Sequence, residues 1–228
     1  MHVWKVGIMG KCLIFGQNYF SEMMCEYIER YTDQEVVAYT VNRKYIQENV
    51  LGNIPIIPYE ELEQIWKPEE VSILVTAGYR GMNELRRKIS NDVKEKGYDL
   101  QSFIHPSATI YADRIGEGNI ILENVILGMH SQIGNGNIVW NGVNVSHHVQ
   151  IRDYNFLAPS SVVGGKTYIG NNCFLGLNAT VKGGLRVNDY TLVGASAYLD
   201  RDSRKYDVYV PGKREALEGN ISLEMFKK

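Results

Sequence analysis

An aliphatic residue recurs at every sixth position through the second half of this chain. The series runs without a gap from Ile115 to Leu199 and holds fifteen residues, each of them Ile, Val or Leu. A period of six fits neither an α-helix, which repeats after about 3.6 residues, nor a plain strand, which repeats after about two. It therefore predicts a supersecondary repeat in which one six-residue unit stacks on the next.

Each six-residue unit combines a short strand with a tight corner. Four residues after each aliphatic position stands a mostly small side chain, and these two positions face the same side of a strand. We count the offset of each position from the aliphatic residue, which is offset zero. Offset one is often Gly and the next two offsets are often Asn, residues that tolerate the positive φ of a tight corner. The pattern resembles the left-handed parallel β-helix of hexapeptide-repeat acyltransferases, in which three such units make one triangular coil. Ile115 follows Ile110 by five positions instead of six, which predicts a slip in the first coil.

The first hundred residues have no such period. Strand-like runs at 11–16, 35–40 and 71–76 alternate with helical runs at 20–31 and 82–96, an order that predicts a parallel sheet. A ligand of such a sheet would lie at the carboxyl ends of its strands. The candidate substrate-binding residues there are Gly16, Asn18, Asn42 and Gly78, and the two glycines are explained equally well as simple turn residues.

Four segments carry a resemblance to a family of sugar acyltransferases. The segments are residues 36–42, 103–108, 145–153 and 172–178. The family that they resemble includes the sialic acid O-acetyltransferases and the bacillosamine-type and perosamine-type N-acetyltransferases. The resemblance implies an α/β Rossmann-like domain at 1–100 that holds a nucleotide sugar and a left-handed β-helix at 101–205 that binds acetyl-CoA. A C-terminal tail would follow at 206–228. It also implies a homotrimer with active sites between neighbouring subunits.

Stacking of one three-unit coil on the next brings three of the five histidines to one corner. One column there is Met129, His147, Gly165 and Gly183, and its neighbour is His130, His148, Lys166 and Gly184. Acyl transfer to an amine needs a base and an N–H donor for the oxygen that becomes negative. We expect His147 to be the base and the backbone N–H of Gly165 to be the donor. Solvated corner histidines beside ordinary turn glycines are the alternative.

Further contacts follow from the same corner and from the family. The glycines leave room for the pantetheine arm of CoA, so we expect Gly183 and Lys166 to contact the cofactor and His148 to contact the acceptor sugar. His148 stands where the family commonly has Glu or Asp. In related enzymes a Pro-containing segment with a basic residue lies beside the CoA nucleotide, which points to Lys213. A solvated cationic tail is the alternative.

An apolar column stands at the outward-facing offset five, with one member in each coil. Its members are Ile120, Ile138, Phe156, Phe174 and Leu192. A contiguous exposed apolar column usually marks an interface. We therefore expect trimerisation through this face, with Phe156 of one subunit close to the active corner and the cofactor of the next.

These features predict an acetyl-CoA-dependent N-acetyltransferase acting on an amino group of a nucleotide-linked sugar. Three alternatives remain. O-acetylation of a sugar would use the same base, and a scaffold would bind CoA or sugar without turnover. Stacked His130 and His148 also allow a metal site like that of the γ-class carbonic anhydrases, although we expect no metal.

Composition narrows the partners and the compartment. A net charge of −2 with scattered Lys and Arg argues against nucleic acid as a partner. Three widely spaced cysteines give no disulfide framework, and no run approaches the roughly 18 apolar residues of a membrane span. We expect a soluble, cytoplasmic protein.

Overall fold

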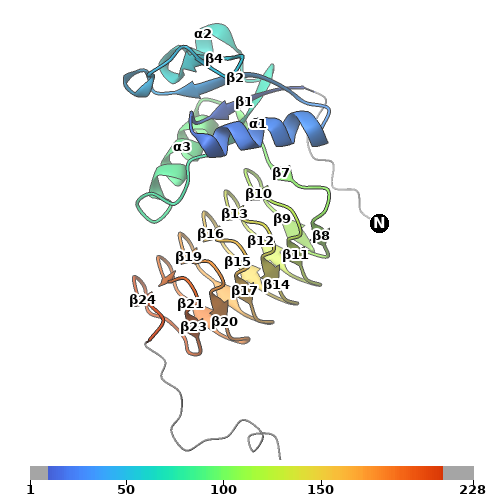
Figure 1. Cartoon of the computed structure of the whole chain (residues 1–228), viewed down its shortest axis with the longest axis vertical. Coiled ribbons are helices and arrows are strands. Elements are labelled where there is room, and N and C mark those ends of the chain that lie inside the picture. The colour runs from blue at the N-terminus through green and yellow to red at the C-terminus, as the bar shows by residue number, and fades with distance from the viewer. Residues whose placement is uncertain (1–9, 213–228) are drawn as a thin grey trace, which may run out of the picture.

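The computed structural model describes residues 10–212, in which a layered sheet sits on one side of a long coil of short strands (Figure 1). The sheet has the strand order β3-β4-β2-β1-β5-β6, and its strands pair in parallel except where β3 meets β4. Its strands are β1 (Lys11–Phe15), β2 (Glu35–Val41), β3 (Val50–Leu51), β4 (Ile54–Pro58), β5 (Val71–Val75) and β6 (Asp99–Leu100), and its helices are α1 (Tyr19–Tyr31), α2 (Leu62–Ile65) and α3 (Glu84–Glu95).

Helix α1 shows how local sequence sets these elements. The Asn18 side chain accepts hydrogen bonds from the backbone N–H groups of Phe20 and Ser21, and the Ser21 hydroxyl accepts one from the N–H of Asn18. This reciprocal cap fixes the start of the helix. The buried face carries Met24 and Ile28, four residues apart, as an amphipathic helix requires.

The remaining strands form three parallel sheets that wind around one axis. The sheet that faces the N-terminal layer holds β7 (Phe103–Ile104), β10 (Ile120–Ile121), β13 (Ile138–Val139), β16 (Phe156–Leu157), β19 (Phe174–Leu175), β22 (Leu192–Val193) and β24 (Val208–Tyr209). The second sheet holds β8 (Thr109–Ile110), β11 (Ile126–Leu127), β14 (Asn144–Val145), β17 (Val162–Val163), β20 (Thr180–Val181) and β23 (Tyr198–Leu199). The third holds β9 (Arg114–Ile115), β12 (Gln132–Ile133), β15 (Gln150–Ile151), β18 (Tyr168–Ile169) and β21 (Arg186–Val187).

Strand register confirms the coil and its slip. Gln132 pairs with Gln150, three six-residue units further on, and this step recurs along the three sheets. Thr109 pairs with Ile126, a step shorter by one, because one residue is missing between Ile110 and Ile115. The strand β24 lies beyond Lys205, in the segment assigned to the C-terminal tail, and pairs with β22.

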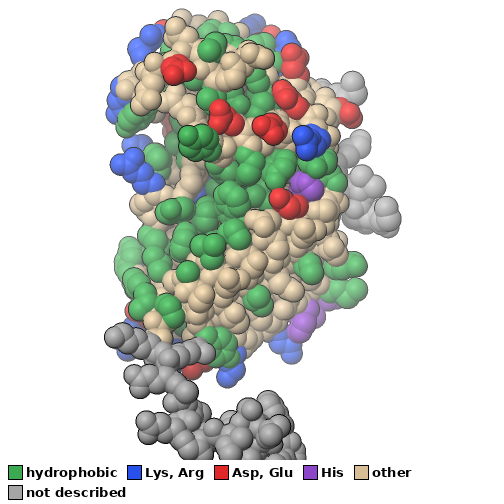
Figure 2. Space-filling model, viewed as in Figure 1, with side chains coloured by type: hydrophobic (Ala, Val, Ile, Leu, Met, Phe, Trp, Pro, Cys, Tyr) green, Lys and Arg blue, Asp and Glu red, His purple; other side chains and the backbone are tan. Residues whose placement is uncertain are grey.

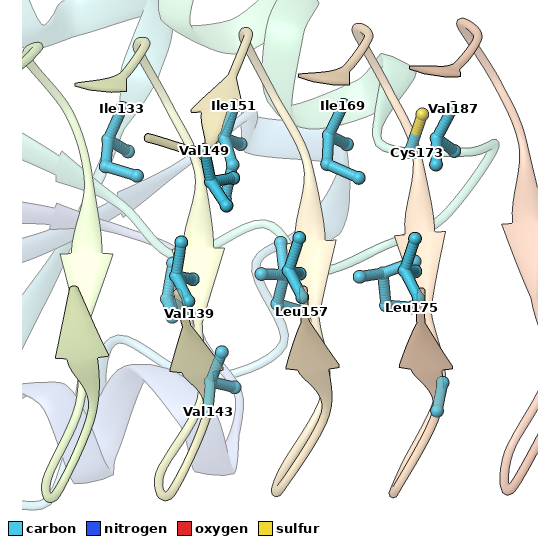
Figure 3. Close-up of a cluster of buried hydrophobic side chains, with 14 of the residues drawn as sticks. Ile133, Val139, Val143, Val149, Ile151, Leu157, Ile169, Cys173, Leu175 and Val187 are labelled. Carbon is cyan, nitrogen blue, oxygen red and sulfur yellow. The ribbon is translucent and has the colours of Figure 1, made fainter. Parts of the chain in front are cut away.

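The interior of the coil is lined by the predicted aliphatic positions. Figure 3 shows Val139, Leu157 and Leu175 in one row and Ile133, Ile151 and Ile169 in another, all within the coil. The small residues at offset four are buried beside them, as predicted: Ser131, Ser161, Thr167, Cys173, Ala179, Thr191 and Ala197. The alternating pattern therefore fixes which side chains fill the core.

The corner glycines have a different role from the predicted one. Positive φ occurs at offset three, as at His148, Lys166 and Asn172, so the prediction holds for Asn there. It is wrong for Gly at offset one and for Asn at offset two, none of which has positive φ. A Cβ on Gly164 would lie 2.4 Å from the backbone nitrogen of Gly183. Those glycines are needed because neighbouring coils approach too closely for a side chain.

Three of the five residues of the predicted trimer face are covered by the chain itself. Ile120 and Ile138 are fully buried, and Phe156 is 6% exposed, in one cluster with Met24 and Ile28 of α1. Figure 2 shows hydrophobic side chains gathered along this junction on the face in view. The prediction of an exposed apolar column was therefore wrong for these three members, whereas Phe174 and Leu192 are partly exposed. Periodicity identifies an outward apolar face without naming the element that packs on it.

Arg86 of α3 ties the sheet to the coil. It is 1% exposed and donates to the carbonyls of Gly136 and Asn155 in the coil at 2.8 and 3.0 Å. It also donates to the carbonyls of Ala77 and Gly78, which follow β5, and to the Asn83 side chain. Burial lowers the pKa of Arg86 to about 9, so the side chain remains charged at neutral pH.

Candidate functional site

The predicted corner lies between the second and third sheets. Residues 146–149 join β14 to β15, and residues 164–167 join β17 to β18 one coil further along. The N–H of Lys166 donates to the carbonyl of His147, and the N–H of Gly184 donates to that of Gly165, both at 2.9 Å. Residues one full coil apart are therefore direct neighbours here, and the structure brings His147 and Gly165 together as predicted.

Gly165 provides the space for the His147 ring. A Cβ on Gly165 would lie 2.7 Å from Nε2 and 2.8 Å from Cε1 of His147. No residue with a side chain fits there unless the imidazole moves. The consequence is that Nε2 of His147 lies directly against the backbone of Gly165, where a thioester carbonyl could reach both groups.

In the described part of the chain, one N–H in each of three coils at this corner has no internal acceptor, whereas the N–H of the next residue donates to the neighbouring coil. Among residues 10–212, no hydrogen-bond partner takes the N–H of Gly165, and the same holds for His147 and Gly183 in the same column. At the corner between the third sheet and the sheet facing the N-terminal layer, the equivalent N–H groups are occupied. There, Asn135 donates to Asp153 and Asn171 donates to Asp189, each at 2.7 Å. The corner at Gly165 thus offers a row of free donors, as an oxyanion site requires.

The three corner histidines form a connected row. His147 Nδ1 lies 3.1 Å from His148 Nδ1, and the His148 ring lies 4.9 Å from the His130 ring between centroids. His130 Nδ1 lies 3.3 Å from Oδ2 of Asp113. Sequence reasoning missed Asp113, which lies in the shortened corner between β8 and β9. His148 was expected to contact the acceptor sugar, and the structure places its Nδ1 against His147.

Only some of the residues predicted to contact the cofactor lie at the corner of Gly165. Gly183 stacks on Gly165, and the exposed Lys166 follows Gly165 at the same corner. Phe156 does not reach this corner in its own chain, and its burial corrects the expectation that it contacts the cofactor of a neighbouring subunit. It packs beneath Tyr79 and stacks on Phe174 at 5.3 Å. Lys213 lies outside the described residues.

The candidate residues of the N-terminal sheet lie at one edge, because β1, β2 and β5 run in parallel. A Cβ on Gly16 would lie 2.3 Å from Oγ1 of Thr76, so close packing requires glycine there. Asn18 caps α1, and Asn42 donates to Glu60. The carbonyl of Gly78 accepts from Arg86. Each has a structural role, and their role in ligand binding stays a prediction.

Cysteine and metal chemistry receive no support within residues 10–212. Burial raises the pKa of the Cys12 and Cys173 thiols to about 12 and also raises that of Cys25, so these thiols stay protonated near neutrality. No group of three or more His, Cys, Asp and Glu side chains in that part of the chain is arranged to hold a metal ion. The same residues contain no helix that is long and apolar enough to cross a membrane.

Comparison with known proteins identifies the fold. No protein-family model matches the chain, and no curated protein matches its sequence. The acetyltransferase domain of PglB from Neisseria gonorrhoeae, solved with acetyl coenzyme A, has a TM-score of 0.78 at 22% identity over 87% of this chain and 94% of that one. PerB from Caulobacter crescentus, solved with CoA and GDP-perosamine, has a TM-score of 0.75 at 24% identity over 88% and 94%. The stacked parallel sheets implied by the family resemblance are thereby confirmed.

Proposed function

From a fold shared with two acetyltransferases, we propose that this chain transfers an acetyl group from acetyl-CoA to an amino group of a nucleotide-linked sugar. One of the similar structures was solved with acetyl coenzyme A and the other with CoA and GDP-perosamine, which supports these substrate classes. The observation that carries the proposal is the contact between the His147 ring and Gly165, whose N–H is free of internal acceptors among residues 10–212.

The chemistry follows from these two groups. The sugar amine attacks the thioester carbon, and Nε2 of His147 takes the proton that the amine loses. The carbonyl oxygen becomes negative in the tetrahedral intermediate and accepts a hydrogen bond from the N–H of Gly165. The C–S bond then breaks, and the CoA sulfur leaves with the proton held by His147. The amide product and free CoA account for all atoms.

Each part of the chain has a proposed task. A Rossmann-like domain at 1–100 holds the nucleotide at the carboxyl edge of its sheet, near Gly16, Asn18, Asn42 and Gly78. A left-handed β-helix at 101–205 holds acetyl-CoA along its glycine corner, with Lys166 and Gly183 beside the cofactor. The tail at 206–228 adds Lys213. Three buried, unpaired cysteines support a reducing compartment such as the cytoplasm.

A homotrimer fits the exposure of the site. His147 and His148 are both exposed on an outer edge of the coil. Acyl transfer is favoured where water is excluded, and one convex edge cannot enclose two substrates. A neighbouring copy would supply the second wall of the cleft. Since Ile120, Ile138 and Phe156 of the apolar column are buried, we place this contact on the second or third sheet of the coil.

The proposed activity is tested by the release of free thiol from acetyl-CoA. The acceptors are nucleotide sugars that carry an amino group, each paired with the sugar that has a hydroxyl at that carbon. We expect thiol release and an acetylated product with at least one amino sugar, at a rate at least about tenfold above that of its hydroxyl partner. Faster reaction of the hydroxyl sugar would indicate O-acetylation. No release with any acceptor would favour a binding scaffold.

A further inference from the structure

We propose that His148 is a positioning residue that holds His147 in the tautomer needed for acetyl transfer, with His130 and Asp113 fixing the His148 ring. The proposal rests on the proposed function, because it concerns how the base of that reaction is prepared. It starts from the contact of 3.1 Å between the Nδ1 atoms of His147 and His148.

A contact between two imidazole nitrogens requires one proton donor and one acceptor. If Nδ1 of His147 carries the hydrogen, its Nε2 has a free lone pair against Gly165 and can take the proton of the amine. If Nδ1 of His148 carries it instead, Nε2 of neutral His147 is protonated and cannot act as a base. The identity of the donor therefore decides whether His147 is active.

The reaction itself favours His147 as the donor. Once Nε2 has taken the proton, the imidazolium must donate from Nδ1, and neutral His148 is the acceptor in contact with it. A hydrogen bond from a charged donor is stronger than one between neutral groups. The contact therefore stabilises the charged state formed during transfer more than the resting state, which raises kcat more than it changes KM.

The rest of the row orients His148. Its N–H donates to the carbonyl of Met129 at 2.9 Å, and its φ of 57° sets the direction of the side chain. The His130 ring packs against it at an interplanar angle of 50°, and Asp113 lies 3.3 Å from Nδ1 of His130. The side chains of His130 and Asp113 are 58% and 55% exposed. Because water screens them, we expect an effect smaller than that of removing the base itself.

The variants His148→Gly and His148→Asp test this role. Glycine and aspartate both tolerate the φ of 57° that the backbone has at position 148. Glycine removes the acceptor, and Asp supplies a carboxylate acceptor at the same place. We expect His148→Gly to lower kcat by about 10- to 100-fold with the KM for acetyl-CoA within about threefold, and His148→Asp to restore most of kcat. In a chain that already carries His147→Ala, His148→Gly should cause no further loss.

Three kinetic results would overturn the proposal. They are an unchanged kcat in His148→Gly, an equal further loss in the His147→Ala background, or no rescue by an Asp variant with native thermal stability. Nitrogen-15 NMR of the histidine side chains gives a readout that needs no turnover. We expect Nδ1–H on His147 in the unaltered protein and a shift toward Nε2–H in His148→Gly. Nε2–H on neutral His147 of the unaltered protein would exclude the proposal even if acetyl transfer occurs, whereas absent turnover with Nδ1–H in place would contradict only the proposed function.

Discussion

Acetyl transfer is expected to slow by about 10²- to 10⁴-fold when His147 is replaced with Ala, because the amine then loses its proton without a positioned base. The backbone of Gly165 and the rest of the corner remain, so the KM for acetyl-CoA should change little. Initial rates of thiol release at saturating substrates measure the effect. Gln150→Ala is a suitable control, since Gln150 is exposed three residues away and makes no contact with the His147 ring among the described interactions.

The loss must come from chemistry and not from unfolding. His147 is exposed and contributes no buried contact to the core, so the variant should keep the thermal midpoint of the unaltered protein. An unchanged rate would remove His147 from the mechanism. A rate loss matched by the Gln150→Ala control would indicate a general disturbance of the corner.

Replacing Arg86 with Met should have the largest effect on stability, a loss of about 3–5 kcal/mol in the free energy of unfolding. Met fills a similar volume but donates nothing, so the carbonyls of Gly136, Asn155 and Gly78 lose their shared donor in a buried place. Denaturant unfolding at a fixed protein concentration measures the change. Arg86→Lys should fall between the unaltered protein and the Met variant, because one ammonium group cannot reach all five acceptors.

The neighbouring Arg87 provides the matched control. Its side chain is 43% exposed and pairs with Glu84 on the same helix. Exposed pairs of this kind contribute about 0–1 kcal/mol, so Arg87→Met should change stability by no more than that. Equal losses in the two variants would contradict the account of Arg86 as the buried link between sheet and coil.

The regular spacing explains why so much of the coil could be predicted. A fixed step of three six-residue units places His147 beside Gly165 and lines the interior with the aliphatic positions, whatever the rest of the chain does. The slip at Ile110–Ile115 was also visible. The contact of Asp113 with His130 was not visible, because it appears only when the shortened corner between β8 and β9 is stacked on the next coil.

Contacts between separate elements could not be predicted from spacing. The outward column with Ile138 and Phe156 has the same pattern whether α1 or another subunit covers it. Arg86 has the sequence signature of an exposed helical charge, and only the packing of α3 on the coil buries it. The elements β3 and α2 were missed because two to four residues give too little periodicity to separate strand or helix from loop. The strand β4 was missed because Pro55 and Pro58 weaken its strand pattern.

A crystal structure of the protein with bound acetyl-CoA would show whether the thioester meets His147 and Gly165. We expect the thioester oxygen to lie within hydrogen-bond distance of the Gly165 nitrogen, beside Nε2 of His147. The pantetheine arm should pass Gly183, and a second copy of the chain should close the cleft. Acetyl-CoA bound along another corner, such as the one lined by Asn135 and Asp153, would contradict it.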